Sequence, residues 1–317
     1  MDRTIKYIVQ DDYAGLSIKD FLKRMHYSAQ SISDQKHFED GIMHNKQRAY
    51  VNEALMSGDE LVINCHEVTS SEKIPPVPMK LDILYEDEDV VIVNKPADMP
   101  VHPSLNNYEN TLANGLADYY ESQGQMFVFR CMNRLDRNTT GAVLVAKNPI
   151  SGAMLSEMIR ERKIEKEYVA IAEGKFKPGI TKPGIVYREN LDNGCDKSIE
   201  FIIDAPIARV EGSTIERCVD FDRGERAVTH VRVLEVTKSE NTFVSCKLET
   251  GRTHQIRVHM AYIGHPLIED GMYNPSCADS GDGQMLHCRK LEFVQPITGE
   301  KISVEAPLPD RMQEYFD

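Results

Sequence analysis

The stretch CMNRLDRNTTGAVLVAKN, residues 131–148, places one carboxylate between two guanidinium groups directly before an apolar run. Asp136 lies between Arg134 and Arg137, and residues 142–146 have the composition of a buried strand. Charges are rarely carried to the edge of a core without a partner or a purpose. Asp136 is therefore either half of a structural ion pair, or a nucleophile or base that an adjacent arginine keeps ionised.

Other side chains with chemical potential stand at the edges of predicted core elements. Tyr168 lies within an apolar strand, Arg252 directly follows another strand, and Arg257 lies inside an otherwise apolar helical turn. The chain has no glycine-rich phosphate loop and no GxSxG elbow, which excludes the mechanisms that depend on these motifs. Asp136, Tyr168, Arg252 and Arg257 are therefore the candidates that are left.

The histidines do not indicate a metal site. His254 and His259 are five residues apart, so they do not share a helix face as an i, i+4 pair would. His102 stands alone in a proline-framed loop, where a structural or solvent-facing role is more common than catalysis. No metal is therefore expected.

The composition is that of an ordinary soluble globular protein, with 41% hydrophobic and 27% charged residues among 317. No apolar run approaches the roughly 18 residues of a membrane span, and the N-terminus has no signal-peptide core. Seven scattered cysteines without a CxxC pair indicate reduced thiols and a cytoplasmic location.

The net charge and the distribution of charged residues limit the kinds of partner that the protein can bind. The net charge of −13 argues against a non-specific nucleic-acid coat protein. Residues 130–166 nevertheless carry eight Lys and Arg against four Asp and Glu. Such a region could bind a polyanion at one place or be a solvated helix face, and charge alone does not choose between them.

The chain divides by composition into three parts. Residues 1–66 read as a small module, residues 67–80 are rich in Ser and Pro and predict an extended linker, and residues 81–317 form a large domain. In the large domain, helix and strand patterns mix without a strict βαβ rhythm, which favours an α+β fold over a doubly wound one.

Hydrophobic periodicity and capping residues place the elements. The predicted helices cover residues 17–25, 32–40, 110–120 with Asn110 as cap, 151–163, and 253–264 with Thr253 as cap. The predicted strands cover residues 60–63, 90–93, 142–146, 166–174, 227–236 and 242–249.

Four motifs resemble those of the RluA-type family of RNA pseudouridine synthases. LYEDEDVVIVNKPADMPVHP is similar to the family's opening motif, and NRLDRNTTG is similar to its catalytic motif, usually written HRLDxxTSG. KEYVAIAEG is similar to the strand KxYxAxxxG, and LETGRTHQIRVH is similar to LxTGRxHQIRxH. The resemblance spans most of residues 81–307. One position departs, because Asn133 stands where histidine is usual.

The resemblance implies a fold and an activity. The fold is α+β, with a mixed, mainly antiparallel central sheet flanked by helices, plus a small N-terminal α/β module similar to RNA-binding ones. The activity is isomerisation of uridine to pseudouridine in structured RNA, either ribosomal large-subunit RNA or transfer RNA. Because the isomerisation needs no redox change or energy input, no cofactor is expected. RNA is the expected partner, no membrane is involved, and a monomer is the default.

The resemblance also implies catalytic roles. Asp136 would be the essential carboxylate, acting by addition to the ring, attack on the ribose or deprotonation of the ribose. Tyr168 would stack on the extracted base and assist as a general base, since an aromatic ring suits planar uracil and its hydroxyl is a polar handle. Arg252 would pair with Asp136 and keep it ionised.

Three further residues would bind the substrate. Arg134 would occupy or hold open the space left when the uridine flips out of its stack. Ile256 would supply an apolar floor to the pocket. Asn133 stands in the catalytic motif, and its replacement of histidine bears on how the substrate is positioned.

Three alternatives remain open from the sequence. One is a catalytically silent RNA-binding or ribosome-assembly protein with the same fold. Another is an unrelated hydrolase that uses Asp136, which the order of the motifs disfavours. The third concerns the N-terminal module, which has six Lys and Arg against seven Asp and Glu over residues 17–64. Because such modules hold RNA largely through phosphate neutralisation, it either binds weakly through a small basic face or merely packs.

Overall fold

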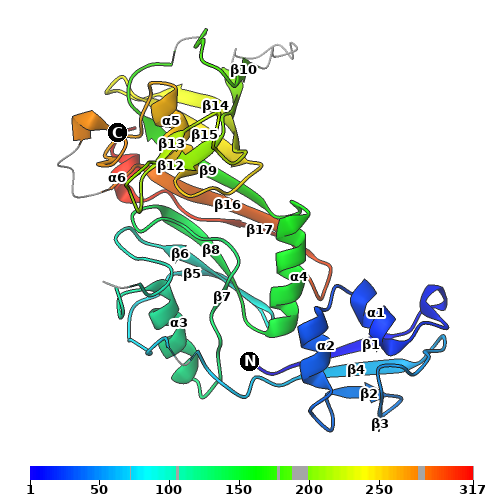
Figure 1. Ribbon diagram of the computed structural model, residues 1–317. Helices are drawn as coiled ribbons and strands as arrows, with labels where there is room; N and C mark the ends of the chain where they lie inside the picture. Colours follow the sequence, from blue (N-terminus) through cyan, green and yellow to red (C-terminus); the bar gives the residue numbers. More distant parts are fainter. Residues whose placement is uncertain (72, 105–106, 177–178, 188–198, 278–282, 317) are drawn as a thin grey trace.

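The computed structural model describes residues 1–71, 73–104, 107–176, 179–187, 199–277 and 283–316. Within these ranges the chain forms a small N-terminal sheet and a large mixed sheet, which Figure 1 shows beside each other. No helix in these ranges is both long and apolar enough to cross a lipid bilayer.

The N-terminal sheet is antiparallel with the order β1-β4-β2-β3. Its elements are β1 (Arg3–Ile8), a 3-10 turn (Asp11–Tyr13), α1 (Ile18–Arg24), α2 (Ala29–Gln35), β2 (Ile42–His44), β3 (Gln47–Arg48) and β4 (Glu60–Cys65). Ser17 caps α1 as its position before the apolar face predicts, its hydroxyl accepting from the amide of Asp20. The second predicted helix was misplaced: Ser28 caps α2, so the helix begins before Ile32 and ends at Gln35.

The large sheet contains eleven strands among the described residues. They are β5 (Ile83–Glu86), β6 (Val90–Lys95), β7 (Arg130–Cys131), β8 (Thr140–Ala146), β9 (Glu165–Ala172), β10 (Ile185–Tyr187), β11 (Glu200–Asp204), β14 (Val228–Val236), β15 (Thr242–Leu248), β16 (Leu286–Val294) and β17 (Lys301–Glu305). The order is β10-β11-β14-β15-β9-β16-β8-β6-β5, with β17 on β16 and β7 on β8. A separate hairpin pairs β12 (Ile207–Arg209) with β13 (Arg217–Val219).

The sheet is mixed and mainly antiparallel, as the resemblance implies. The described pairs are antiparallel except β16 with β8, which run parallel at His287 and Cys288. Every residue of β8 is buried, which confirms the buried strand predicted over residues 142–146. β6 is paired along its whole length with β8, so the apolar centre of the sheet lies directly behind the loop that precedes β8.

Four helices accompany this sheet: α3 (Leu112–Glu121), α4 (Pro149–Arg160), α5 (Gln255–Tyr262) and α6 (Asp310–Gln313), together with a 3-10 turn (Pro275–Cys277). The helices predicted over residues 110–120, 151–163 and 253–264 are present, but two predicted caps are wrong. Thr111, not Asn110, caps α3 and forms a capping box with Asn114. His254, not Thr253, precedes α5, and its side chain does not cap the helix.

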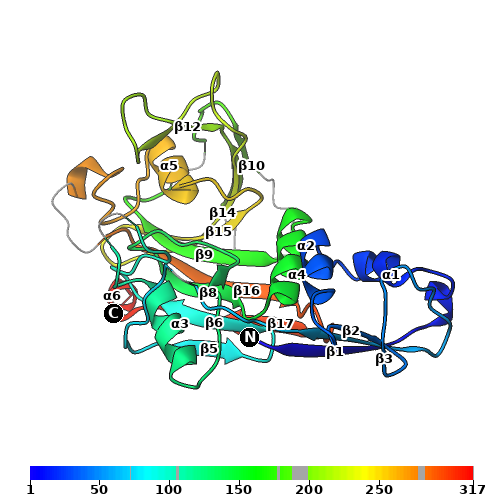
Figure 2. The same ribbon diagram turned by 60° about the horizontal axis from the view of Figure 1, so that its bottom comes forward.

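Helix α4 joins the two sheets. Ile150 and Met154 of this helix belong to the apolar core of the N-terminal part, packing with residues such as Ile32. Figure 2 shows α4 between the large sheet and the module that carries α1 and α2. The N-terminal part therefore shares a core with the large domain through one helix.

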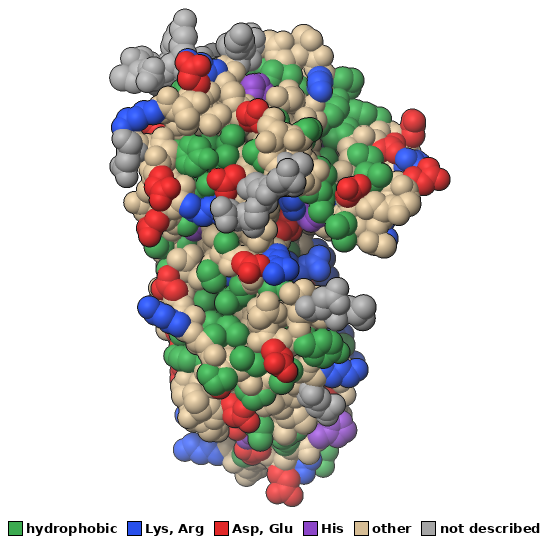
Figure 3. Space-filling view, turned by 90° about the vertical axis from the view of Figure 1, so that its left-hand side faces the viewer, with side chains coloured by type: hydrophobic (Ala, Val, Ile, Leu, Met, Phe, Trp, Pro, Cys, Tyr) green, Lys and Arg blue, Asp and Glu red, His purple; other side chains and the backbone are tan. Residues whose placement is uncertain are grey.

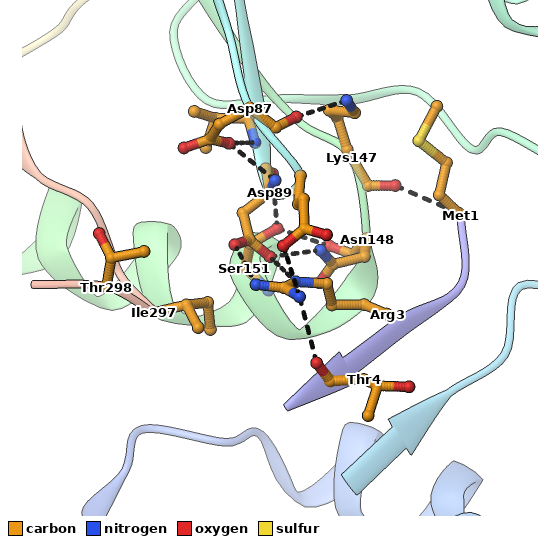
Figure 4. Close-up of polar contacts among 12 residues, drawn as sticks. Met1, Arg3, Thr4, Asp87, Asp89, Lys147, Asn148, Ser151, Ile297 and Thr298 are labelled. Carbon is orange, nitrogen blue, oxygen red and sulfur yellow. Dashed lines mark hydrogen bonds and ion pairs between the residues drawn. The ribbon is translucent and has the colours of Figure 1, made fainter. Parts of the chain in front are cut away.

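A buried polar cluster centred on Asp89 also ties the two parts together (Figure 4). Asp89 accepts hydrogen bonds from Arg3 at 3.0 and 3.1 Å, from Asn148 at 2.9 Å and from Gln295 at 2.9 Å. These partners come from β1, the cap of α4 and the turn after β16. Because the carboxylate is only 1% exposed, these hydrogen bonds are what offset the cost of its burial.

Replacing Asp89 with asparagine is expected to lower the free energy of unfolding by roughly 2 kcal/mol, since Arg3 loses its buried carboxylate. Chemical denaturation followed by circular dichroism measures this. Glu88→Gln is the matched control, because Glu88 also pairs with Arg3 at 2.8 Å but is 75% exposed. A surface pair contributes less than about 1 kcal/mol. Equal effects of the two variants would contradict the central role of Asp89.

Candidate active site

A pocket of about 1390 Å³ opens on the large sheet. It is lined by residues of β9, β11, β14 and β15, the loop before β8, and the start of α5. The six site residues predicted from the sequence all line it: Asn133, Arg134, Asp136, Tyr168, Arg252 and Ile256. Segments separated by more than a hundred residues thus meet in one cavity.

Asp136 lies in the loop between β7 and β8, and its side chain is 29% exposed. Its backbone carbonyl accepts from the amide of Thr139 at 3.1 Å, which closes a turn just before the buried strand. The next residue, Arg137, accepts from the amide of Met99 at 3.2 Å through its carbonyl. The rim of the sheet therefore holds the carboxylate at the pocket wall without burying it.

Arg257, not Arg252, is the arginine that pairs with Asp136. Its Nη1 donates to Asp136 Oδ2 at 3.2 Å, and its Nε and Nη2 donate to Asp270 at 2.8 and 2.7 Å. The guanidinium carbon lies 5.0 Å from the ring centre of Tyr273. Arg257 thus links a fully buried carboxylate to the partly exposed one in the pocket.

Arg252 occupies the rim instead, which corrects the predicted pairing. Its guanidinium forms an ion pair with the exposed Glu225 and donates through Nε to the carbonyl of Arg226 at 3.2 Å. The physical reason is the helix start. Arg252 precedes α5 and is exposed, whereas Arg257 lies in the first turn of α5 and is buried.

His254 is a second group beside Asp136 that sequence patterns did not single out for the site. Its Nε2 lies 3.9 Å from Asp136 Oδ2, and its Nδ1 is hydrogen bonded to the hydroxyl of Tyr273 at 2.8 Å. Burial lowers its pKa, against the effect of Asp136. With φ of 58°, His254 adopts the left-handed conformation, which is uncommon for residues other than glycine and is often found at functional sites.

Tyr168 is buried on β9, opposite Cys288 of β16 in the register. Burial raises its pKa well above the ordinary value, and the neighbouring Cys288 and Asp136 act in the same direction. Its hydroxyl is therefore protonated in the free protein. The residue offers an aromatic surface and a hydrogen-bond donor to whatever occupies the pocket.

Asn133 is buried, and its side-chain amide hydrogen bonds to β8. Its Nδ2 donates to the carbonyl of Ala142 at 3.0 Å, and its Oδ1 accepts from the amide of Leu144 at 2.7 Å. The position requires one donor and one acceptor, which an amide supplies as a neutral imidazole would. Asn133 thus holds the start of the Asp136 loop on the sheet.

The remaining two predicted residues differ in exposure. Arg134 is exposed at the pocket, whereas Ile256 is buried on α5 and presents apolar surface to the same cavity. Arg137, on the other side of Asp136, pairs with Asp98 on the surface at 2.6 Å. The two arginines that flank Asp136 in sequence therefore both point to solvent, and neither neutralises it.

Lys95 supports this loop from behind. The side chain is fully buried, and its ammonium donates to the carbonyls of Pro96, Met99 and Arg137, each at 2.8 Å. Burial lowers its pKa to about 7, while Asp136 raises it. One lysine thereby fastens the loop after β6 to the loop that carries Asp136.

Lys95→Met is expected to lower the free energy of unfolding by about 2 kcal/mol, because three carbonyls lose the hydrogen bond from this buried ammonium. Turnover is expected to fall about tenfold, since the Asp136 loop is no longer held. Thermal denaturation and a turnover assay measure the two effects. Lys80→Met, at an exposed lysine, is the control. An unchanged melting temperature in Lys95→Met would show that the loops do not depend on this lysine.

Comparison with known proteins decides the family. Residues 89–262, more than half of the chain, match the family described as RNA pseudouridylate synthase. The chain belongs to this family. It isomerises uridine to pseudouridine in RNA, as the four motifs predict.

Individual relatives of this pseudouridine synthase cover almost all of it. The Bacillus subtilis protein named "Uncharacterized RNA pseudouridine synthase YjbO" is 34% identical over 95% of this chain and 98% of its own length. The Escherichia coli protein named "Ribosomal large subunit pseudouridine synthase D" is 34% identical over 90% of this chain and 83% of its own. The solved human structure titled "RNA Pseudouridylate Synthase Domain Containing 1" has a TM-score of 0.55 at 27% identity, covering 72% of this chain and 83% of that one.

Proposed function

We propose that this pseudouridine synthase modifies uridines of large-subunit ribosomal RNA, with Asp136 as the essential carboxylate. The likeness to a relative named for the ribosomal large subunit supports the substrate class. The observation that carries the role of Asp136 is its pairing with Arg257 at 3.2 Å in the wall of a large pocket. A carboxylate that is ionised and still accessible can act as a nucleophile or a base.

The proposed mechanism begins with base flipping, because an enzyme cannot reach a glycosidic bond inside a helical stack. The exposed Arg134 enters the space that the uridine leaves. Tyr168 and Ile256 receive the base between an aromatic and an aliphatic surface. Asp136 then acts on the ring or on the ribose, and the base turns and rejoins through carbon 5. The rim position of Arg252 suits a contact with the RNA backbone.

The surface is compatible with an RNA partner despite the net charge of −13. Figure 3 shows one face on which acidic, basic and apolar side chains are interspersed, with a group of basic side chains at mid-height.

We further propose that residues 1–66 form an RNA-binding module and that residues 67–80 link it to the catalytic domain at 81–317. We propose also that the enzyme acts as a cytoplasmic monomer without metal or cofactor. We also propose that residues 175–226, which are long and rich in turns, take part in target choice; part of this segment lies outside the described residues.

Tritium release from RNA labelled at uridine carbon 5 tests the proposal, because that carbon loses its proton when the new bond forms. Transcripts of large-subunit ribosomal RNA and of transfer RNA are supplied separately, each without other modifications. Release from ribosomal RNA alone is expected. Release only from transfer RNA would overturn the substrate class. Binding without release from either would favour the silent RNA-binding alternative.

A further inference from the structure

Lys166 on β9 is a pocket residue with an unusual environment. It lines the cavity and is half-buried, yet its ammonium forms no hydrogen bond or ion pair with any residue in the described ranges. Lys95, the other lysine behind the site, gives its protons to three carbonyls. Half-burial removes part of the water around the ammonium, which costs free energy when no partner replaces that water. Lys166 therefore has an unmet demand for a negatively charged or strongly polar oxygen.

The groups nearest to Lys166 do not meet that demand. Its electrostatic neighbours are the thiols of Cys288 and Cys131. Burial raises the pKa of each thiol to about 12, so both are neutral at physiological pH. The ammonium thus faces two uncharged sulfur atoms.

The adjacent carboxylates are directed elsewhere. Glu165 and Glu167 flank Lys166 on β9 and also line the pocket. Glu167 accepts a hydrogen bond from Ser245 at 2.8 Å, and Glu165 lies 3.7 Å from Lys247. Both acids thus interact with other side chains, and neither forms an ion pair with Lys166.

Residues two apart in a strand share a face, so Lys166 and Tyr168 lie on one face of β9, about 7 Å apart. A base received by Tyr168 would lie within reach of the ammonium. Three of the arginines that line the pocket are disposed differently, since Arg134, Arg162 and Arg252 are exposed. Those exposed cations suit the phosphates of the RNA backbone, and Lys166 suits the group that enters the pocket.

We propose that Lys166 is a catalytic residue whose ammonium binds a carbonyl oxygen of the flipped uracil and stabilises the negative charge that develops on the ring. The inference rests on the proposed roles of Asp136 and Tyr168, but not on the route that Asp136 takes. Addition of its carboxylate to the ring moves an electron pair onto the ring oxygens. Cleavage of the bond between ribose C1′ and N1 leaves the bonding pair on the ring and spreads it to the same oxygens.

The step balances without a further reactant. The electron pair left on the ring forms the new bond from C5 to C1′. C5 then loses its proton and N1 gains one, so the product is an isomer of the substrate. An ammonium fixed beside the ring stabilises the charged stage more than the neutral start or end, which is the condition for accelerating the reaction.

Single-turnover kinetics on tritium-labelled large-subunit ribosomal RNA test this with Lys166→Met, Lys166→Arg and the exposed strand variant Lys301→Met. Lys166→Met is expected to slow the chemical step about 100-fold, as loss of one charge-stabilising donor does. The dissociation constant for the RNA is expected to stay within about twofold, because the interaction strengthens only as charge develops. Lys166→Arg is expected to recover part of the rate, and Lys301→Met all of it.

Two readouts separate this from a structural role. Because Lys166 has no partner to lose, its methionine variant should melt no lower than the unmodified protein, unlike Lys95→Met. Burial lowers the pKa of Lys166, so the rate constant should fall as pH rises through a value below that of a free lysine. Lys166→Arg should move that fall to higher pH, because a guanidinium stays protonated.

Three results would overturn the inference. One is an unchanged rate constant in Lys166→Met while Asp136→Asn is inactive, which leaves the proposed function standing. Another is that Lys166→Met binds RNA more weakly, with an unchanged rate constant and a salt dependence of the binding constant that falls by about one charge. That result would assign Lys166 to a backbone phosphate. The third is activity in Asp136→Asn, which would remove the proposed function itself.

Discussion

Asp136→Asn is expected to abolish tritium release, lowering the rate at least about 10³-fold, as removal of a catalytic carboxylate does in other enzymes. The amide is nearly the size of the carboxylate and keeps an oxygen toward Arg257, so the loop should hold its place. It is a far weaker nucleophile and base, which removes every proposed route at once. Single-turnover release, with the RNA dissociation constant measured alongside, separates chemistry from binding.

Asp98→Asn is the matched control for this experiment. Asp98 lies in the neighbouring loop and pairs with Arg137, but it is 75% exposed and lies outside the pocket. It has φ of 57°, a conformation that asparagine tolerates, so the variant should fold and turn over normally. Retention of even a tenth of the normal rate by Asp136→Asn would exclude Asp136 as the essential group.

Arg257→Met is expected to have the largest effect on stability, lowering the free energy of unfolding by roughly 3 kcal/mol. The change leaves Asp270, which is 0% exposed, without the two guanidinium hydrogen bonds that it now accepts. Amides of Met272 and Tyr273 still donate to it, which limits the loss. Turnover should fall as well, because Asp136 loses its cation. Chemical denaturation and tritium release measure the two effects.

Arg252→Met provides the comparison. Its ion pair with Glu225 is on the surface, so the stability cost should stay below about 1 kcal/mol. Adding Asp270→Asn to Arg257→Met should recover part of the stability, because the two residues are coupled through one buried pair. If Arg252→Met were the more destabilising variant, the assignment of Arg257 as the partner of Asp136 would be wrong.

Arg252 and Arg257 illustrate what sequence patterns do not predict, namely which arginine pairs with Asp136. Both stand in the motif LETGRTHQIRVH, and spacing alone treats them alike. Arg257 did carry a signal, since a charge inside an apolar helical turn needs a buried partner. The burial of Asp270 could not be predicted in this way, because nothing near it in sequence indicates that it is 0% exposed. Tyr273 is similarly identified only by its tertiary contacts with His254 and Arg257.

The two predicted helix caps, Asn110 and Thr253, are wrong for different reasons. Thr111 and Asn114 form a reciprocal pair that outcompetes Asn110, and this pairing of residues three apart was a readable signal. The start of α5 was not readable in this way. His254 adopts a left-handed conformation, and its ring contacts Asp136 and Tyr273, which come from distant parts of the chain.

The amino-acid sequence by itself determined the family, the α+β class, the buried strand behind Asp136 and six residues that all line one pocket. These follow from periodicity and from motifs whose residues are close together in the chain. Only the tertiary structure decided which arginine neutralises Asp136 and that Lys166 lines the same pocket. Those are contacts between segments far apart in sequence, and their energies depend on burial and distance, which a linear pattern does not record.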